Sequence, residues 1–220
     1  MPLLSGEKQC FPGETDMLKN LILDMGGVLI RFDPPHFLRE FGLTDEEDIA
    51  FLDETITNSA EWRLTDQGYL TEKEMGERLL QKVPDRLKPA AEMLIYRWPA
   101  EPIPGMEDFV RESKAMGLSV YMLSNVSLRV KEYWNRIPGH ALFDGSVISA
   151  EVHLLKPEPE IYRHLLMKYS LSAEESLFVD DTMRNVLGAE AVGIHGFHFT
   201  GNVQEIRNIR DQMMKKAAES

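Results

Sequence analysis

The chain has 220 residues, of which 43% are hydrophobic, so it can bury one large domain or a core with an insertion. Its net charge of −12 at pH 7 argues against nucleic acid or an anionic membrane surface as a partner and is compatible with a metal cation or a small substrate. A single cysteine excludes an internal disulfide framework and favours the cytoplasm, and no apolar run approaches the roughly 20 residues needed to span a bilayer.

The N-terminal segment leads into the first predicted strand. Residues 1–16 contain proline and glycine but no apolar signal-peptide core, and we expect a loose arm there. The apolar run 21–23 then ends on Asp24, and Gly26 and Gly27 follow. A carboxylate at the tip of a buried strand is costly unless something binds it, and glycine lets the backbone approach a ligand closely. This segment therefore predicts a reactive site.

An all-helical insertion is predicted next, over residues 34–98. This block has helical patterns and no strand pattern, and the segment from Thr71 to Glu74 has the form of a capping box. We expect Trp62 to lie in the core of the insertion. The predicted helices of the block span residues 45–57, 71–81 and 86–97.

Beyond residue 98, short apolar runs alternate with helical patterns. The predicted strands span residues 118–123, 145–148, 176–179 and 193–199. The predicted helices between and before them span residues 104–116, 157–169 and 183–191. This alternation predicts an α/β fold with a doubly wound parallel sheet and right-handed crossovers.

Polar residues stand at the ends of three predicted strands. Asp24 ends the first strand, Ser124 and Asn125 follow the second, and Asp180 and Asp181 end a later one. Because ligands of open parallel sheets bind at the carboxyl ends of the strands, we expect these side chains to converge on one crevice. Their carboxylates form an oxygen-rich set that suits a hard cation such as Mg2+.

Lys156 precedes a predicted helix N-terminus and is placed to turn into the same crevice. Together with Ser124 and Asn125 it supplies ammonium, hydroxyl and amide donors for an anion. A cation, a set of anion donors and a carboxylate nucleophile together indicate phosphoryl transfer through an aspartyl intermediate.

Four segments in this order resemble the signature motifs of the haloacid dehalogenase (HAD)-like hydrolase superfamily. The segments are residues 21–28, residues 123–125, Lys156 with Pro157, and residues 178–181. Each motif is weak alone, but four in the right order on the right elements form a specific pattern.

The resemblance also implies a domain organisation. A Rossmann-like α/β core would consist of residues 17–33 and 99–220. The insertion at residues 34–98 is similar to the small helical cap of the phosphatase branch of the superfamily. The sequence pattern does not indicate an oligomeric state.

The roles of the motif residues follow from the same resemblance. It implies that Asp24 attacks phosphorus, and that Ser124 and Asn125 help to hold the transferring phosphoryl group. Lys156 would also bind the phosphate and neutralise charge on Asp24. The implied Mg2+ ligands are Asp24, Asp180, Asp181 and the backbone carbonyl of Gly26.

Gly26 departs from the family pattern, in which this position is usually an aspartate that protonates the leaving oxygen. Loss of a positioned acid or base typically costs ~10²–10⁴-fold in rate. Superfamily members similar to sugar-1-phosphate phosphatases share this Asp-x-Gly form, so the change does not by itself imply inactivity. We expect either substrates with good leaving groups or an acid from the cap or water, with His36, Asp66 and Glu72 as cap candidates.

The sequence as a whole predicts a Mg2+-dependent phosphatase of a small phosphorylated metabolite, with a sugar phosphate as the family-level expectation. One alternative is a carbon–halogen hydrolase, which also uses an aspartate nucleophile and also lacks the second acid. The Asp180–Asp181 pair favours a metal, and hence phosphate. The other alternative is a catalytically weakened phosphate-binding or regulatory protein, against which Asp24, Lys156 and Asp180 argue.

Overall fold

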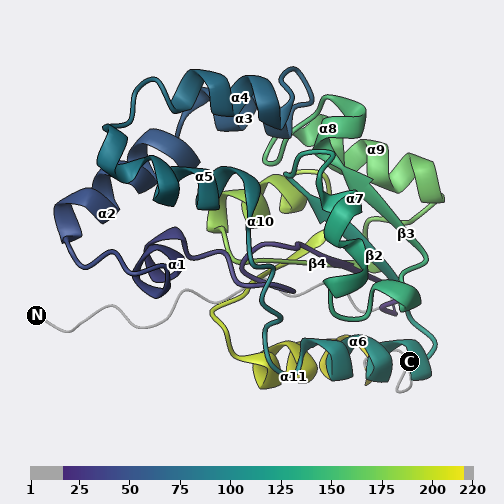
Figure 1. The fold of residues 1–220 in the computed structure, drawn as a ribbon. Coiled ribbons are helices and arrows are strands. Elements are labelled where there is room, and N and C mark those ends of the chain that lie inside the picture. The colour runs from purple at the N-terminus through teal and green to yellow at the C-terminus, as the bar shows by residue number, and fades with distance from the viewer. Residues whose placement is uncertain (1–16, 216–220) are drawn as a thin grey trace, which may run out of the picture.

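A parallel sheet with the strand order β3-β2-β1-β4-β5 forms the centre of the computed structural model, which describes residues 17–215 (Figure 1). In that order the strands are β3 (Gly145–Ile148), β2 (Ser119–Ser124), β1 (Asn20–Leu23), β4 (Ser176–Asp180) and β5 (His195–His198). All neighbouring pairs are parallel, so every strand ends at the same edge of the sheet. The predicted doubly wound parallel sheet is confirmed, and the predicted arm at residues 1–16 lies outside the described residues.

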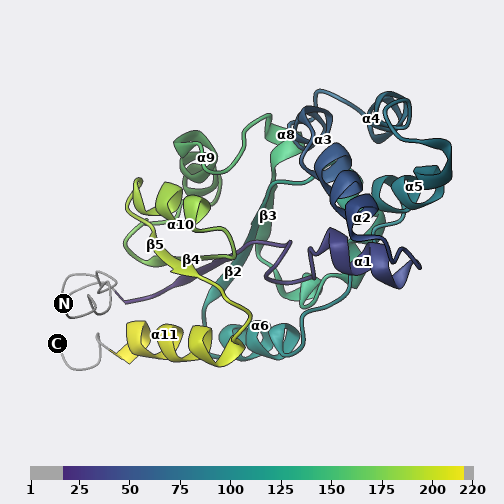
Figure 2. The same ribbon diagram turned by 90° about the vertical axis from the view of Figure 1, so that its left-hand side faces the viewer.

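Helices cover both faces of this sheet (Figure 2). Because successive side chains of a strand point to opposite faces, Leu21 and Leu23 join one apolar cluster and Ile22 joins another. The first cluster includes residues of α6 (Met106–Ala115) and α11 (Val203–Lys215), and the second includes residues of α9 (Pro159–Tyr169) and α10 (Met183–Glu190). Within residues 17–215, no helix is long and apolar enough to cross a bilayer.

The element boundaries differ from the prediction by one or two residues at several places. The predicted helix 157–169 begins at Pro159, because Glu158 precedes a proline and takes an extended conformation with ψ of 130°. The predicted helix 104–116 starts at Met106, after Gly105 in the left-handed region with φ of 85°. Short helices α7 (Val130–Tyr133) and α8 (Ser149–Val152) follow β2 and β3.

Residues 34–98 form helices only, and these lie beyond the carboxyl edge of the sheet (Figure 1). They pack around an apolar cluster of their own, which includes Phe37, Leu52 and Leu79. The elements are α1 (Pro34–Glu40), α2 (Glu46–Leu52) with a π-helical turn (Asp53–Thr57), α3 (Ala60–Asp66), α4 (Glu72–Leu79) and α5 (Lys88–Tyr96). We refer to them as the cap, and its exact boundaries stay a prediction.

Local signals explain which cap helices the sequence predicted. The capping box of α4 is confirmed: the Thr71 N–H donates to Glu74 Oε2 at 2.8 Å and the Glu74 N–H donates to Thr71 Oγ1 at 3.2 Å. Helices α1 and α3 were not predicted, because each has only seven residues and, unlike α2, does not continue into a further helical turn that would establish a period.

The two faces of α9 provide a stability test. Leu165 is fully buried against the sheet, whereas the Met167 residue is 75% exposed. We expect Leu165→Ala to lower the free energy of unfolding by about 2–5 kcal/mol through loss of transfer energy and creation of a cavity. Met167→Ala should change it by less than about 0.5 kcal/mol. Urea unfolding followed by circular dichroism measures both, and equal midpoints would contradict this packing.

Candidate active site

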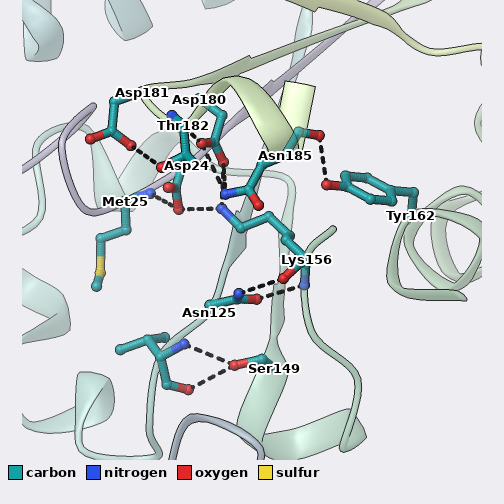
Figure 3. A network of polar contacts seen from close by, with 11 residues as sticks. Asp24, Met25, Asn125, Ser149, Lys156, Tyr162, Asp180, Asp181, Thr182 and Asn185 are labelled. Carbon is teal, nitrogen blue, oxygen red and sulfur yellow. Dashed lines mark hydrogen bonds and ion pairs between the residues drawn. The ribbon is translucent and has the colours of Figure 1, made fainter. Parts of the chain in front are cut away.

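Five residues singled out in the sequence, Asp24, Asn125, Lys156, Asp180 and Asp181, come together at the carboxyl edge of the sheet (Figure 3). Asp24 directly follows β1, Ser124 ends β2, and Asp180 ends β4. Because β1 lies between β2 and β4, Asp24 is flanked by Ser124 on one side and by Asp180 on the other. Lys156 reaches this group from the loop that leads into α9.

The ammonium group of Lys156 joins two carboxylates. Its Nζ lies 2.7 Å from Asp24 Oδ1 and 2.7 Å from Asp180 Oδ2, and its side chain is 1% exposed. The Met25 N–H also donates to Asp24 Oδ1, at 2.7 Å. Among the described residues, Asp24 Oδ2 has no hydrogen-bond partner. One carboxylate oxygen of Asp24 is therefore held in place while the other is left available.

Asn125 determines the position of Lys156. Its Nδ2 donates to the Lys156 carbonyl at 3.0 Å, and its Oδ1 accepts from the Lys156 N–H at 2.8 Å. These two bonds join the loop after β2 to the loop before α9 (Figure 3). Both ends of the amide are engaged, so Asn125 acts here on the Lys156 backbone, and its predicted contact with phosphate stays a prediction.

Asp180 is held by donors on every side. Its Oδ1 accepts from the Thr182 N–H at 2.8 Å, and Asn185 Nδ2 lies 3.0 and 3.1 Å from its two oxygens. Tyr162 supports Asn185 by donating its hydroxyl to the Asn185 carbonyl at 2.7 Å. With Lys156 as a further donor, this fully buried carboxylate is fixed in one orientation.

Asp24, Asp180 and Asp181 can each offer one oxygen such that these atoms lie within 4.8 Å of one another. Asp181 packs against Gly27, where a Cβ atom would lie 2.0 Å from Asp181 Oδ2 and where φ is 73°. Only glycine fits there without displacing the carboxylate. Three carboxylates against one ammonium leave an excess of negative charge, so the donor set fits a hard divalent cation such as Mg2+.

The ionisation of the cluster reflects its burial. Burial raises the pKa of Asp24 to about 7, although the Lys156 ammonium pulls in the opposite direction. The pKa of Asp181 is also raised, first by burial and then by the Asp180 charge. Burial disfavours the charged form of Lys156, but the two adjacent carboxylates outweigh it and hold its pKa above the ordinary value. A bound cation would favour the ionised carboxylates further.

The cluster opens into a pocket of about 320 Å³ between the core and the cap. The core supplies most of its polar lining, including Asp24, Ser124, Lys156 and Asp181. The apolar lining is Met25, Ile30, Phe32, Trp62, Met75, Leu94, Ile95, Trp98, Val126 and Tyr133. Three of these rings pack together: Phe32 stacks on Trp98 with centroids 4.7 Å apart, and Trp62 lies 6.4 Å from each of them.

Two of the three acids considered in the cap line this pocket. Asp66 ends α3 and Glu72 begins α4, and both face the cavity. Burial raises the pKa of Asp66 to about 7. His36 is not part of the described lining; its Nε2 lies 3.5 Å from Glu40 on the same helix.

Several lining residues were not found from the sequence. Phe32, Trp98 and Arg129 were not singled out, and Trp62 was expected only in the core of the cap. Arg129 joins the core to the cap by donating from Nη1 to the Ile95 carbonyl at 2.7 Å and from Nη2 to the Tyr96 carbonyl. Phe32 and Trp98, the aromatic residues at the two ends of the insertion, were the one available signal for a substrate-binding role. The sequence pattern is equally consistent with a role in core packing.

A doubly wound parallel sheet with a buried carboxylate–lysine cluster at its carboxyl edge, covered by helices, has the architecture of an α/β enzyme. Residues 18–193 match a family model described as haloacid dehalogenase-like hydrolase. The chain therefore belongs to the haloacid dehalogenase-like hydrolases, as its four motifs predicted, and it falls in the phosphatase branch.

Comparison with curated proteins gives two fungal relatives. The chain is 31% identical over 204 residues to the sesquiterpene phosphatase astK of Aspergillus oryzae, covering 87% of this chain and 95% of the relative. It is 29% identical over 204 residues to the drimenol cyclase drtB of Aspergillus calidoustus, covering 88% of this chain but only 37% of that protein.

Comparison with solved structures gives the same fold. A HAD family enzyme from Bacteroides thetaiotaomicron, solved in complex with magnesium and inorganic phosphate, superposes with a TM-score of 0.65 at 21% identity. The match covers 86% of this chain and 98% of that chain. At this identity the likeness establishes the fold alone.

The lysine bridge gives a stability prediction. Lys156→Met leaves two buried carboxylates without their shared cation, and we expect the free energy of unfolding at neutral pH without metal to fall by about 3–5 kcal/mol. Lys73→Met, whose side chain is 85% exposed, is the matched control and should change stability by less than about 0.5 kcal/mol. Urea unfolding measures both variants, and an unchanged midpoint for Lys156→Met would contradict the bridge.

Proposed function

We propose that this protein is a Mg2+-dependent phosphatase that works through an aspartyl-phosphate intermediate on Asp24. The observation that carries the proposal is the bridge from Lys156 to Asp24 and Asp180, next to Asp181. The bridge holds Asp24 Oδ1 and leaves Oδ2 available to attack phosphorus, with Ser124 at the neighbouring strand end to hold the phosphoryl oxygens.

The implied metal ligands are Asp24, Asp180, Asp181 and the backbone carbonyl of Gly26, which lines the same pocket. When bound, Mg2+ would neutralise charge on the transferring phosphoryl group. Asn185 and Thr182 keep Asp180 oriented toward the site by their hydrogen bonds to its carboxylate.

Lys156 has two tasks in this proposal. Its ammonium lowers the cost of keeping Asp24 ionised in a buried site, and it neutralises charge as the phosphate approaches. The cap closes the opposite side of the pocket and limits access of water to the phosphoryl group during the first step.

We further propose that the substrate is a phosphate ester of an apolar group. The aromatic cluster of Phe32, Trp62 and Trp98 lines the pocket beside the polar site and offers few polar partners for the hydroxyl groups of a sugar. The fungal relative named as a sesquiterpene phosphatase also supports an apolar substrate. The lining thus favours such an ester over the sugar phosphate expected from the motifs.

The nucleophile and the metal can be tested together. Asp24→Asn should reduce phosphate release from alkyl and aryl phosphates to background, and a chelator should abolish the wild-type activity until Mg2+ is restored. A malachite green assay with free phosphate as the product measures both. Chelator-resistant release of halide from a haloacid would instead favour the carbon–halogen hydrolase, and absence of any turnover would favour a regulatory protein.

The aromatic lining predicts substrate preference. Phe32→Ala removes a ring that contacts the bound apolar group, and we expect KM for a long-chain alkyl phosphate to rise roughly 10- to 100-fold. KM for glycerol phosphate should stay within about twofold, because that small substrate has no apolar chain to pack against the ring. Phe41→Ala is the matched control: Phe41 is 47% exposed, close to the 45% of Phe32, and lies outside the described lining. Equal effects of the two variants would contradict an apolar substrate site.

A further inference from the structure

The site lacks a proton donor beside Asp24 at position 26. A Cβ atom on Gly26 would lie 3.4 Å from Phe32 Cβ, so a side chain there would point at the Phe32 ring. That ring in turn stacks on Trp98. An apolar wall therefore occupies the space next to residue 26, and the donor has to come from another part of the pocket.

The cap forms the wall opposite Asp24. In-line displacement at phosphorus places the leaving oxygen on the side away from the attacking carboxylate. Asp24 stands at the edge of the sheet, so this oxygen faces the cap helices. Within the lining that the structure describes, the cap contributes two carboxyl groups, those of Asp66 and Glu72.

Asp66 is fixed next to the loop that follows β2. Its backbone carbonyl accepts a hydrogen bond from Ser149 Oγ at 2.6 Å, and the same Oγ accepts from the Val126 N–H at 2.8 Å. Ser127 lines the same pocket as Asp66, and its backbone N–H is one of the groups that oppose the rise in the pKa of Asp66. Val126 and Ser127 lie two and three residues beyond Ser124, so the Asp66 carboxyl group lies beside the segment assigned to phosphate binding.

We propose that Asp66 of the cap is the proton donor to the leaving oxygen, in place of the acid that Gly26 lacks; the assignment rests on the proposed phosphatase function. As Asp24 bonds to phosphorus, the ester P–O bond breaks and the Asp66 proton passes to the departing oxygen, so the product leaves as an alcohol. The ionised Asp66 then takes a proton from the water that attacks the aspartyl phosphate, which releases inorganic phosphate and restores Asp24.

The surroundings of Asp66 suit this task. Burial raises its pKa to about 7, against the opposing effect of contacts with Trp62 and Ser127. The charge of Glu72 is one of the causes that raise this pKa, and Glu72 Oε1 is itself buried without a hydrogen-bond partner among the described residues. A donor is most effective when its pKa lies near the working pH. Glu72 therefore acts as a positioning residue that keeps Asp66 protonated.

The decisive test compares leaving groups. Asp66→Asn keeps the shape of the side chain but cannot donate the acidic proton. With enzyme in excess over substrate, so that only the first chemical step is observed, we expect release of a long-chain alcohol from its phosphate to slow by ~10²–10⁴-fold. Release of p-nitrophenol should slow by less than about threefold, because nitrophenolate leaves without protonation.

The pH profile gives a second readout. Because the donor must be protonated, wild-type cleavage of the alkyl ester should fall as pH rises through about 7, and this fall should be absent in Asp66→Asn. Glu72→Gln removes a negative charge near Asp66, so the pH at which alkyl-ester cleavage falls should shift to a lower value. Glu77→Gln, on the exposed face of α4, should leave that pH unchanged. The charged and titratable groups that face Asp66 are Glu72, Lys156, Arg129 and Tyr133.

The outcomes separate this assignment from the proposed function. Equal slowing of both esters in a folded Asp66→Asn protein, or no slowing of either, would overturn the donor role and leave the phosphatase function standing. A wild-type protein that hydrolyses neither ester would overturn the proposed function and this assignment with it. Thermal unfolding of Asp66→Asn within about 3 °C of wild type excludes a folding defect as the cause.

Discussion

The ammonium group of Lys156, placed between Asp24 and Asp180, is the interaction on which the rest of the site depends. Two buried carboxylates at adjacent strand ends would repel each other, and one shared cation makes their burial tolerable. The bridge requires that β1 and β4 are neighbours in the sheet and that a loop brings Lys156 to their ends. The Asn125 side-chain amide holds this loop in place through two hydrogen bonds to the Lys156 backbone. The Lys156 side chain thus links the order of the strands and the path of the loop to the geometry of the proposed site.

The cap changes what this cluster can do. The core alone offers a charged surface, whereas residues 34–98 add Trp62, Trp98 and two carboxyl groups to the lining of the pocket. Ser149 ties the end of α3 to the loop after β2, and Arg129 ties the end of α5 to the core. The same contacts that hold the cap on the core also hold Asp66 at the wall of the pocket. In the proposed mechanism, substrate choice and proton delivery therefore both depend on how the cap packs on the core.

Most of the fold could be predicted because its signals are local. Apolar runs ending on Asp24, Ser124 and Asp180 indicated the buried strands, and the Thr71 capping box indicated α4. The short helices α1 and α3 were not predicted because each stands alone with seven residues, whereas α2 continues into a π-helical turn that lengthens the pattern. Helix α9 begins two residues late because the residue before a proline avoids the helical conformation.

The sequence by itself determined the residue types of the site and their order, since three of the four motifs end predicted strands and the fourth, at Lys156, precedes a predicted helix. It also indicated that Gly26 removes an acid, and that Asp66 was one of three candidates to replace it. Only the tertiary structure narrowed the three: His36 lies near Glu40 and outside the described lining, while Asp66 and Glu72 both line the pocket. The reason is physical, because the direction of a cap side chain depends on how separate helices pack, and the sequence around each candidate carries no local signal of that packing.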